Sequence, residues 1–134
     1  MMKLILVDDN KAFREGIKFY LECILHHEVI GMASNGKEFL DLNNKLEADA
    51  ILMDIEMPLM NGIEATKLAL WEWEGLKVIA ITNYRHMAYL KDLILAGFRA
   101  CIFKDKFYDE FDNTIFRVLE GDLVFPKNIK TEEN

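Results

Sequence analysis

Residues 50–53 read AILM and are followed at once by Asp54. A short, β-rich apolar run of this kind predicts a strand that is buried on both faces of a sheet. Three other runs have the same character and a fifth is weaker; they are Leu4–Val7, Val78–Ile81, Ala100–Phe103 and Val29–Ala33. The sequence therefore predicts five strands.

The segments between these runs have helical periodicity. Apolar residues recur at the spacing of a helix face at Phe13, Ile17, Leu21 and Ile24, and again at Phe111, Ile115 and Leu119. Strand and helix thus alternate five times along the chain. This alternation favours an α/β fold with a parallel sheet, right-handed crossovers and helices on both faces. In such sheets, functional sites form at the carboxyl ends of the strands.

Size and composition fit one domain with its own core. The chain has 134 residues, of which 51% are hydrophobic. Its formal charge is −7 and no basic run stands out, which argues against direct nucleic-acid binding. Its apolar runs are too short for a signal peptide or a membrane span, so a cytoplasmic location is expected. Cys23 and Cys101 lie in apolar stretches and are expected to be small core residues rather than disulfide partners.

Polar residues close the predicted strands and should meet at one rim of the sheet: Asp8 and Asp9, Asp54, Thr82 and Lys104. Each of them alone could be a helix cap or a solvated charge. Together, three carboxylates at one rim repel one another unless a cation or a shared proton compensates them. Mg²⁺ prefers oxygen ligands, and a carboxylate can act as the nucleophile that forms an aspartyl-phosphate. The residues therefore point to metal-assisted phosphoryl transfer.

In order and spacing, these and neighbouring residues resemble the receiver pattern of bacterial two-component response regulators. The residues that carry the resemblance are Asp8-Asp9, Met53-Asp54, Met57-Pro58, Gly62, Thr82 and Lys104. The resemblance implies a flavodoxin-like, doubly wound (βα)5 fold with a five-stranded parallel sheet in the order 2-1-3-4-5. It extends from about Lys3 to Gly121. We therefore expect a receiver domain over residues 1–121 and a tail or the start of a linker over residues 122–134.

The resemblance implies a role for each acidic residue. Asp54 would be the phosphoacceptor and Asp9 a direct ligand of Mg²⁺ or Mn²⁺. Asp8 would hold a metal-bound water, and the backbone carbonyl of Glu56 would be a further ligand. The phosphoryl donor would be a sensor histidine kinase or a phosphotransfer protein. Such a domain modifies itself and turns over no outside substrate, so it is not expected to be an enzyme.

By the same resemblance, Thr82 and Lys104 would contact the phosphoryl oxygens. The Lys104-Asp105 junction and the segment Glu120–Pro126 resemble receivers of LuxR/NarL-type transcription regulators, whereas many other receivers have Pro in place of Asp105. This predicts transcription regulation through a C-terminal DNA-binding domain that is absent from this sequence. Homodimer formation on activation is compatible with that output.

Residues around the site depart from the commonest receiver pattern. Cys101 stands where an aromatic residue usually changes rotamer during switching. Asn83 replaces a smaller residue and could narrow the access to Asp54. Tyr84 could cover the approach of water to the phosphorus, and Glu56 places negative charge near that approach. A fairly long-lived phosphorylated state is therefore expected.

Three alternatives stay open at this point. A stand-alone receiver would act through protein–protein contacts. A pseudo-receiver would serve only as a docking module, but pseudo-receivers usually lose the acidic residues that are present here. A haloacid dehalogenase-like phosphatase also combines Asp, Thr, Lys and Mg²⁺ on a parallel sheet. In that family the nucleophile closes the first strand, and here Asn10 stands where its general acid is expected.

Overall fold

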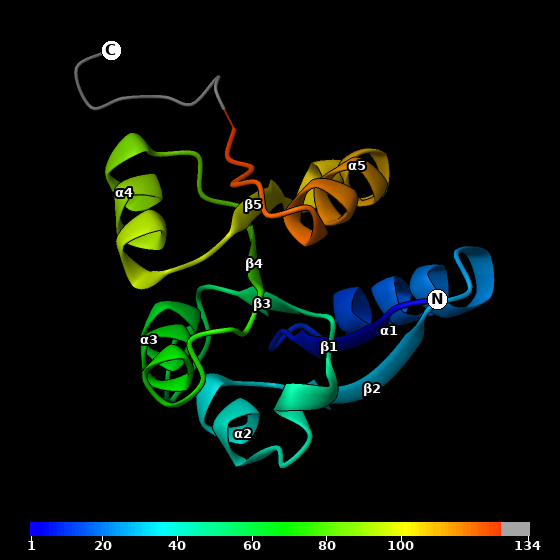
Figure 1. Cartoon of the computed structure of the whole chain (residues 1–134), viewed down its shortest axis with the longest axis horizontal. Coiled ribbons are helices and arrows are strands. Elements are labelled where there is room, and N and C mark those ends of the chain that lie inside the picture. The colour runs from blue at the N-terminus through cyan, green and yellow to red at the C-terminus, as the bar shows by residue number, and fades with distance from the viewer. Residues whose placement is uncertain (127–134) are drawn as a thin grey trace.

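The computed structural model describes residues 1–126, which form one five-stranded parallel sheet with helices on both faces (Figure 1). The strand order is β2-β1-β3-β4-β5, which confirms the flavodoxin-like order 2-1-3-4-5 that the receiver resemblance implied. The five strands are β1 (Lys3–Val7), β2 (Glu28–Ala33), β3 (Ala50–Asp54), β4 (Val78–Thr82) and β5 (Ala100–Phe103). Each agrees with its predicted run to within one residue at either end.

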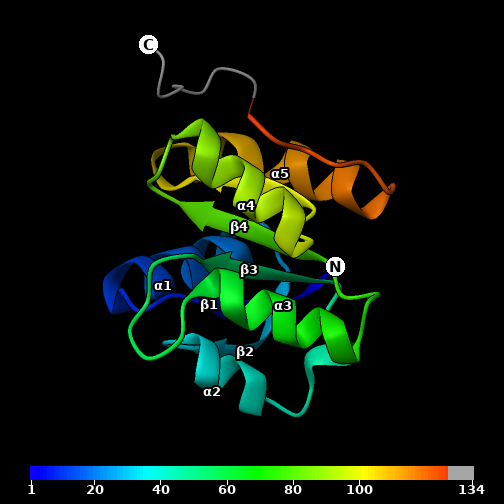
Figure 2. The ribbon, with the colours of Figure 1, turned by 90° about the vertical axis from the view of Figure 1, so that its left-hand side faces the viewer.

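Helices α1 and α5 cover one face of the sheet, and helices α2, α3 and α4 cover the other (Figures 1 and 2). Their bounds are α1 (Lys11–Phe19), α2 (Gly36–Asp41), α3 (Gly62–Glu72), α4 (Met87–Ala96) and α5 (Phe107–Leu119). A π-helical turn (Tyr20–Ile24) extends α1, and short 3-10 turns occupy Lys45–Glu47 and Lys104–Lys106. In the described part of the chain, no helix is long and apolar enough to span a membrane.

Strands β1, β3, β4 and β5 are buried on both faces, as their continuous apolar character predicted, whereas the weaker run at the edge strand β2 is only partly buried. In β1, Leu4 and Leu6 pack into the core on the α1 and α5 side, whereas Ile5 and Val7 pack into the core on the opposite side. Every residue of β3 and β4 is buried. Because side chains alternate between the faces of a strand, one apolar run supplies two separate cores.

Asparagine side chains cap the helices that begin near the carboxyl ends of the strands. The Asn10 side chain accepts a hydrogen bond from the Phe13 N–H at the start of α1. Asn61 does the same for the Glu64 N–H at the start of α3. These caps satisfy orphan helix donors, so the neighbouring aspartates are not needed for that purpose. The helix-cap explanation for the strand-end aspartates is therefore wrong.

The turn after α1 corrects the expectation that Cys23 is a core residue. Cys23 is exposed, and so is Ile24, whereas Cys101 is buried in β5 as expected. Both exposed side chains lie in the π-helical turn, which rotates less per residue than an α-helix. The apolar stripe of α1 is therefore out of phase after Leu21, and the α-helical spacing no longer predicts which residues are buried.

The chain does not leave the domain directly after α5. Val124 forms a parallel bridge with Ala100, and the segment 122–126 follows the outer edge of β5. The expected division at residue 121 stays a prediction, because the first residues of the supposed tail contact the sheet. Residues 127–134, the rest of that tail, lie outside the described residues.

Candidate functional site

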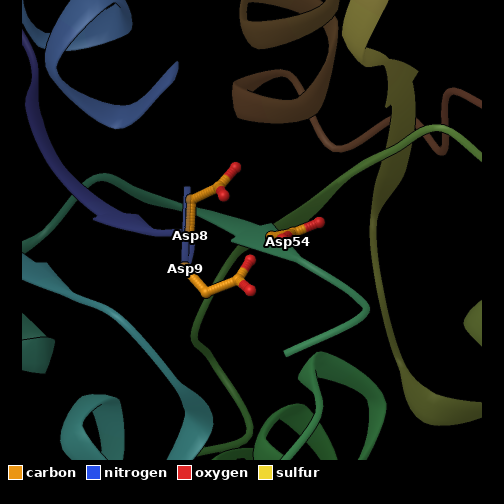
Figure 3. A group of neighbouring side chains, drawn as sticks. All are labelled: Asp8, Asp9 and Asp54. Atoms are coloured by element: carbon orange, nitrogen blue, oxygen red, sulfur yellow. The ribbon is translucent and has the colours of Figure 1, made fainter. Parts of the chain in front are cut away.

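Three aspartates from two neighbouring strands meet at the carboxyl end of the sheet. Asp8 and Asp9 follow β1, and Asp54 is the last residue of β3. Figure 3 shows the three carboxyl groups on the same side of these strand ends. One oxygen from each carboxyl group lies within 4.8 Å of the others. Asp8 and Asp54 are buried, whereas Asp9 is exposed, so the cluster is open to solvent on the Asp9 side.

Lys104 brings a positive charge from the end of β5 to this cluster. Its Nζ lies 2.9 Å from Asp8 Oδ2 and 3.5 Å from Asp54 Oδ1. The same Nζ lies 4.6 Å from the centroid of the Phe13 ring, which belongs to the first turn of α1. The ammonium group is thus held by two carboxylates and an aromatic face. One lysine offsets only part of the charge of three aspartates. When all three are ionised the site has a net negative charge, which favours binding of a cation.

Backbone contacts orient the two buried carboxylates. Asp8 Oδ1 accepts a hydrogen bond of 2.8 Å from the Asn10 N–H, and the Arg14 guanidinium donates to the Asp8 carbonyl oxygen. Asp54 Oδ1 accepts a hydrogen bond of 2.9 Å from the Ile55 N–H. The Asn10 and Ile55 N–H groups restrict the rotamers of the two carboxylates, so the cluster is arranged before any ligand arrives.

Gly62 allows the first turn of α3 to pack directly against the β3 end. A Cβ at this position would lie 2.1 Å from the Asp54 carbonyl oxygen, which is far too close for any side chain. The Gly62 N–H donates a hydrogen bond of 2.8 Å to the Ile55 carbonyl oxygen. The glycine of the recognised pattern therefore has a structural reason, because it lets α3 support the backbone at Asp54.

The surroundings of Asp54 favour its neutral form when no cation is bound. Burial raises the pKa of Asp54 to about 7, and the charge of Asp8 acts in the same direction. Lys104 and the hydrogen bond from the Ile55 N–H lower this pKa, but they do not outweigh the burial. A carboxylate with such a perturbed pKa in a cleft is a candidate for chemistry.

Thr82 and Tyr84 form the side of the site next to β4. Thr82 is buried, and its hydroxyl oxygen accepts a hydrogen bond of 3.1 Å from the Tyr84 N–H, which leaves the hydroxyl proton free to donate. The Tyr84 hydroxyl donates to the Glu56 carboxylate at 2.8 Å, which links two loops at the mouth of the site. These residues border a pocket of about 490 Å³ that is lined by Asp9, Asn10, Asp54, Glu56, Thr82, Asn83, Tyr84 and Lys104.

The structure therefore brings together all the side chains that the sequence placed at the strand ends, and it adds partners that the sequence did not reveal. Phe13 was predicted only as part of a helix face, and Arg14 was not singled out. The sequence does not indicate the contacts of Phe13 with Lys104 or of Arg14 with Asp8, because these contacts depend on the orientation of the first turn of α1 relative to the site. Cys101 lines a separate pocket at the outer edge of β5, bordered by α5 and by residues 124–126, and not the acidic pocket.

The fold and the acidic pocket define a signalling receiver of the two-component class. The chain belongs to the response regulator receiver domain family, whose model matches residues 4–115. It is 32% identical over 132 residues to the transcriptional regulatory protein LnrK of Bacillus subtilis, covering 98% of this chain and 60% of that protein. It is 34% identical to LiaR of the same organism, covering 91% of this chain and 58% of that protein. The chain thus spans about three fifths of these relatives' length.

Solved structures of response regulators have the same fold. A LuxR-family two-component response regulator from Aurantimonas sp. SI85-9A1 superposes with a TM-score of 0.85 at 24% identity, covering 92% of this chain and 89% of that chain. The response regulator ChrA of a heme-sensing two-component system superposes with a TM-score of 0.76 at 26% identity, covering 94% and 60%. Receivers of this family act in two-component signalling and interact with histidine kinases.

Proposed function

We propose that Asp54 accepts a phosphoryl group from the phosphohistidine of a sensor histidine kinase or phosphotransfer protein. An Asp54 carboxylate oxygen forms the new O–P bond while the P–N bond of the phosphohistidine breaks and its electron pair returns to the imidazole. The observation that carries this proposal is the position of the buried Asp54 carboxyl group between Lys104 and the two other aspartates. Because its pKa is raised, a bound cation would have to stabilise the deprotonated Asp54 carboxylate before its oxygen attacks the phosphorus.

The residues of the pocket fit a hard divalent cation, and we propose Mg²⁺ or Mn²⁺. Asp9 and Asp54 would be direct carboxylate ligands, Asp8 would hold a metal-bound water, and the Glu56 carbonyl would be a further ligand. The fit rests on three carboxyl oxygens within 4.8 Å of one another. When bound, the metal ion supplies charge neutralisation for the phosphoryl oxygens. The exposed Asp9 side leaves room for waters, which Mg²⁺ retains.

Thr82 and Lys104 would bind the phosphoryl oxygens. The Thr82 hydroxyl retains a proton that it can donate, because its oxygen already accepts the Tyr84 N–H. The Lys104 ammonium lies 3.5 Å from Asp54 Oδ1 and would then balance part of the added charge. Phosphorylation of Asp54 would therefore shift the loop that follows β4 and the end of β5 toward the phosphoryl group.

The contact between Tyr84 and Glu56 supports a slow loss of the phosphoryl group. The hydrogen bond between them spans the mouth of the pocket, where a hydrolytic water would have to approach. Asn83 also lines this pocket and would narrow the access to Asp54 further. The negative Glu56 carboxylate would disfavour a hydroxide-like nucleophile near the phosphorus. We therefore propose a fairly long-lived phosphorylated state.

The output proposed for the whole protein is transcription regulation in the cytoplasm. Its support is that the curated relatives LnrK and LiaR are transcriptional regulatory proteins of which this chain covers about three fifths. The DNA-binding activity would belong to a segment outside the receiver, and activation would act through a homodimer. Another receiver-fold protein, RcsB, is described as dimers bound to DNA. The domain itself would turn over no outside substrate.

Incubation with Mg²⁺ and acetyl phosphate tests the proposed phosphoacceptor. We expect one phosphoryl group per chain by intact-mass spectrometry, and no label on the Asp54→Asn variant. Asp41→Asn is the matched control, because Asp41 is exposed at the end of α2, away from the pocket. Undiminished labelling of Asp54→Asn would refute the assignment. Multiple turnover of a phosphomonoester would instead support the haloacid dehalogenase-like alternative.

A further inference from the structure

The segment 122–126 is attached to the sheet through its backbone. The Cys101 N–H donates a hydrogen bond of 3.0 Å to the Val124 carbonyl oxygen. The Val124 N–H donates a second bond of 3.0 Å to the Arg99 carbonyl oxygen. Figure 1 shows this segment, in orange to red after α5, running beside β5. Because β5 is the last strand of the sheet, the segment covers an edge that would otherwise be unpaired.

Phe125 anchors this segment by its side chain. It is half-buried and packs against the core cluster that contains Cys101 and Phe103 of β5. These three side chains border one pocket of about 480 Å³, together with Arg85. The small thiol of Cys101 leaves space at the middle of the strand, and an aromatic ring from the following segment lies beside it. The segment therefore supplies aromatic surface at a position where the strand itself has none.

Arg85 connects this pocket to the acidic site. Its guanidinium carbon lies 4.0 Å from the centroid of the Phe103 ring, and it forms an ion pair with Asp105, directly after Lys104. Arg85 lies three residues after Thr82, in the loop that leads to α4. In the sheet register, Thr82 is also the partner of Phe103. One short loop thus contacts both the phosphoryl-binding side of the site and the wall of the Phe125 pocket.

We propose that the segment 122–126 is a conformational strap whose attachment to β5 weakens when the Asp54 site is occupied. This inference rests on the proposed phosphorylation of Asp54. When the Thr82 hydroxyl binds a phosphoryl oxygen, its present contact with the Tyr84 N–H changes and the following loop, including Arg85, must adjust. The adjustment moves one wall of the pocket away from Phe125.

The strap responds first because few contacts hold it. Two backbone hydrogen bonds to β5, the partly buried Val124 and Phe125 side chains and the contacts of Asp122 with Arg117 attach it, whereas the neighbouring strands are paired along their full length. Segments with so few contacts open locally at a low cost in free energy. The occupancy of the site would therefore change how residues 122–126 are held against β5.

Amide hydrogen exchange at the two strap bonds tests the inference. With Mg²⁺ and the phosphoryl mimic beryllofluoride, we expect the Cys101 and Val124 amides to exchange about tenfold faster, while the Leu6 amide in β1 does not change. Phe125→Ala should make both amides exchange fast even without beryllofluoride and remove the further response. Leu123→Ala is the matched control, because Leu123 lies in the same segment with its side chain 58% exposed.

Fluorine NMR of the bound beryllofluoride separates this inference from the proposed function. A bound signal with unchanged exchange at both amides would overturn the strap and leave the phosphoacceptor intact. Absence of a bound signal would overturn both. If Leu123→Ala removed the response as fully as Phe125→Ala, the role given to the Phe125 ring would be wrong.

Discussion

At the residue scale, the proposed function depends on a carboxyl group that is buried beside other aspartates. Burial raises the pKa of Asp54 to about 7, with a further contribution from Asp8, although Lys104 lies 3.5 Å away. The site tolerates this arrangement because a cation or a phosphoryl–cation pair would relieve it. The repulsion between the carboxylates destabilises the folded protein when no cation is bound, and it therefore favours cation binding.

This raised pKa predicts how the stability of the metal-free protein changes with pH. An unfolded chain would release the Asp54 proton near pH 4, whereas the folded protein retains it to about pH 7. The contribution of this group therefore favours folding at low pH and is lost as the pH rises through that interval. Urea denaturation should show the loss in the wild type and a flatter profile in Asp54→Asn. Equal slopes for both proteins would contradict the prediction.

Gly62 provides a test of the close approach between α3 and β3. Gly62→Ala should lower the free energy of unfolding by on the order of 3 kcal/mol, because its Cβ would meet the Asp54 carbonyl oxygen, which is backbone. Gly75→Ala is the control, since a Cβ there meets nothing within 4 Å, and it should change stability by less than about 0.5 kcal/mol. Urea denaturation of both variants gives the comparison, and similar values would disprove the packing argument.

The positions of residues at strand ends could be predicted from the sequence, whereas contacts that depend on the path of a loop could not. Asp8, Asp54 and Lys104 had to meet because parallel strands end at one rim. The contact between Arg85 and Asp105 could not be inferred, since it depends on the path of two loops. In the sequence, Asp105 is distinctive only because many receivers have Pro at this position.

At the element scale, the loop between β4 and α4 carries side chains and backbone groups that border the site. Its backbone at Tyr84 binds the Thr82 hydroxyl, while the Tyr84 side chain reaches Glu56 in the loop after β3. The Tyr84 ring also lies 5.0 Å from the ring of Tyr89 in α4, measured between centroids. The loop is therefore attached to the helix behind it and to the opposite side of the pocket.

Tyr84 should accordingly control the lifetime of the phosphorylated state. Tyr84→Ala is expected to speed phosphate loss about tenfold, because it removes the ring and its contact with Glu56 at the pocket mouth. Tyr84→Phe keeps the ring and loses only the hydrogen bond, so it should have a smaller effect. Decay of the phosphorylated protein, followed by mass spectrometry, measures both rates. An unchanged or slower decay of Tyr84→Ala would remove this residue from the account.

The elements also show where helical periodicity is a sufficient guide. In α5, Phe111 and Ile115 are buried as their spacing predicted, whereas Leu119 at the helix end is partly exposed. In the first helix the pattern fails after Leu21, because a π-helical turn changes the angle between successive side chains. The error over Cys23 has this local cause.

At the scale of the whole molecule, binding at one rim should stabilise the entire domain. The sheet links both cores, and the site residues stand at the carboxyl ends of four of its strands, β1, β3, β4 and β5. A ligand that binds only the folded state raises the free energy of unfolding in proportion to the logarithm of its concentration. The Mg²⁺ dependence of stability is therefore a measure of the site.

Thermal unfolding with increasing Mg²⁺ should show a midpoint that continues to rise with the logarithm of the Mg²⁺ concentration above the dissociation constant. Asp9→Ala should remove most of this rise, because it deletes the exposed carboxylate that is proposed as a direct ligand of the metal ion. Asp49→Ala is a less suitable control, since Asp49 accepts a bond from the Lys3 N–H, so Asp41→Ala is preferred. An equal Mg²⁺ response in Asp9→Ala would contradict the proposed metal site.

The alternation of strands and helices was sufficient to predict the sheet, its parallel strands and its two helical layers. The strap at β5 was not predictable, because the segment 122–126 has no strand periodicity and is held by a single bridge. Its polar start resembled a tail. The space beside Cys101, the ring of Phe125 and the backbone hydrogen bonds of Val124 explain why it returns to the sheet.

Borohydride reduction of the freshly phosphorylated protein tests the central claim most directly. An acyl phosphate on aspartate is reduced to homoserine, which peptide mass spectrometry locates on the chain. The account predicts homoserine at position 54 and unmodified Asp8 and Asp9. Homoserine at position 8 or 9, or a labelled protein with no homoserine at position 54, would contradict it.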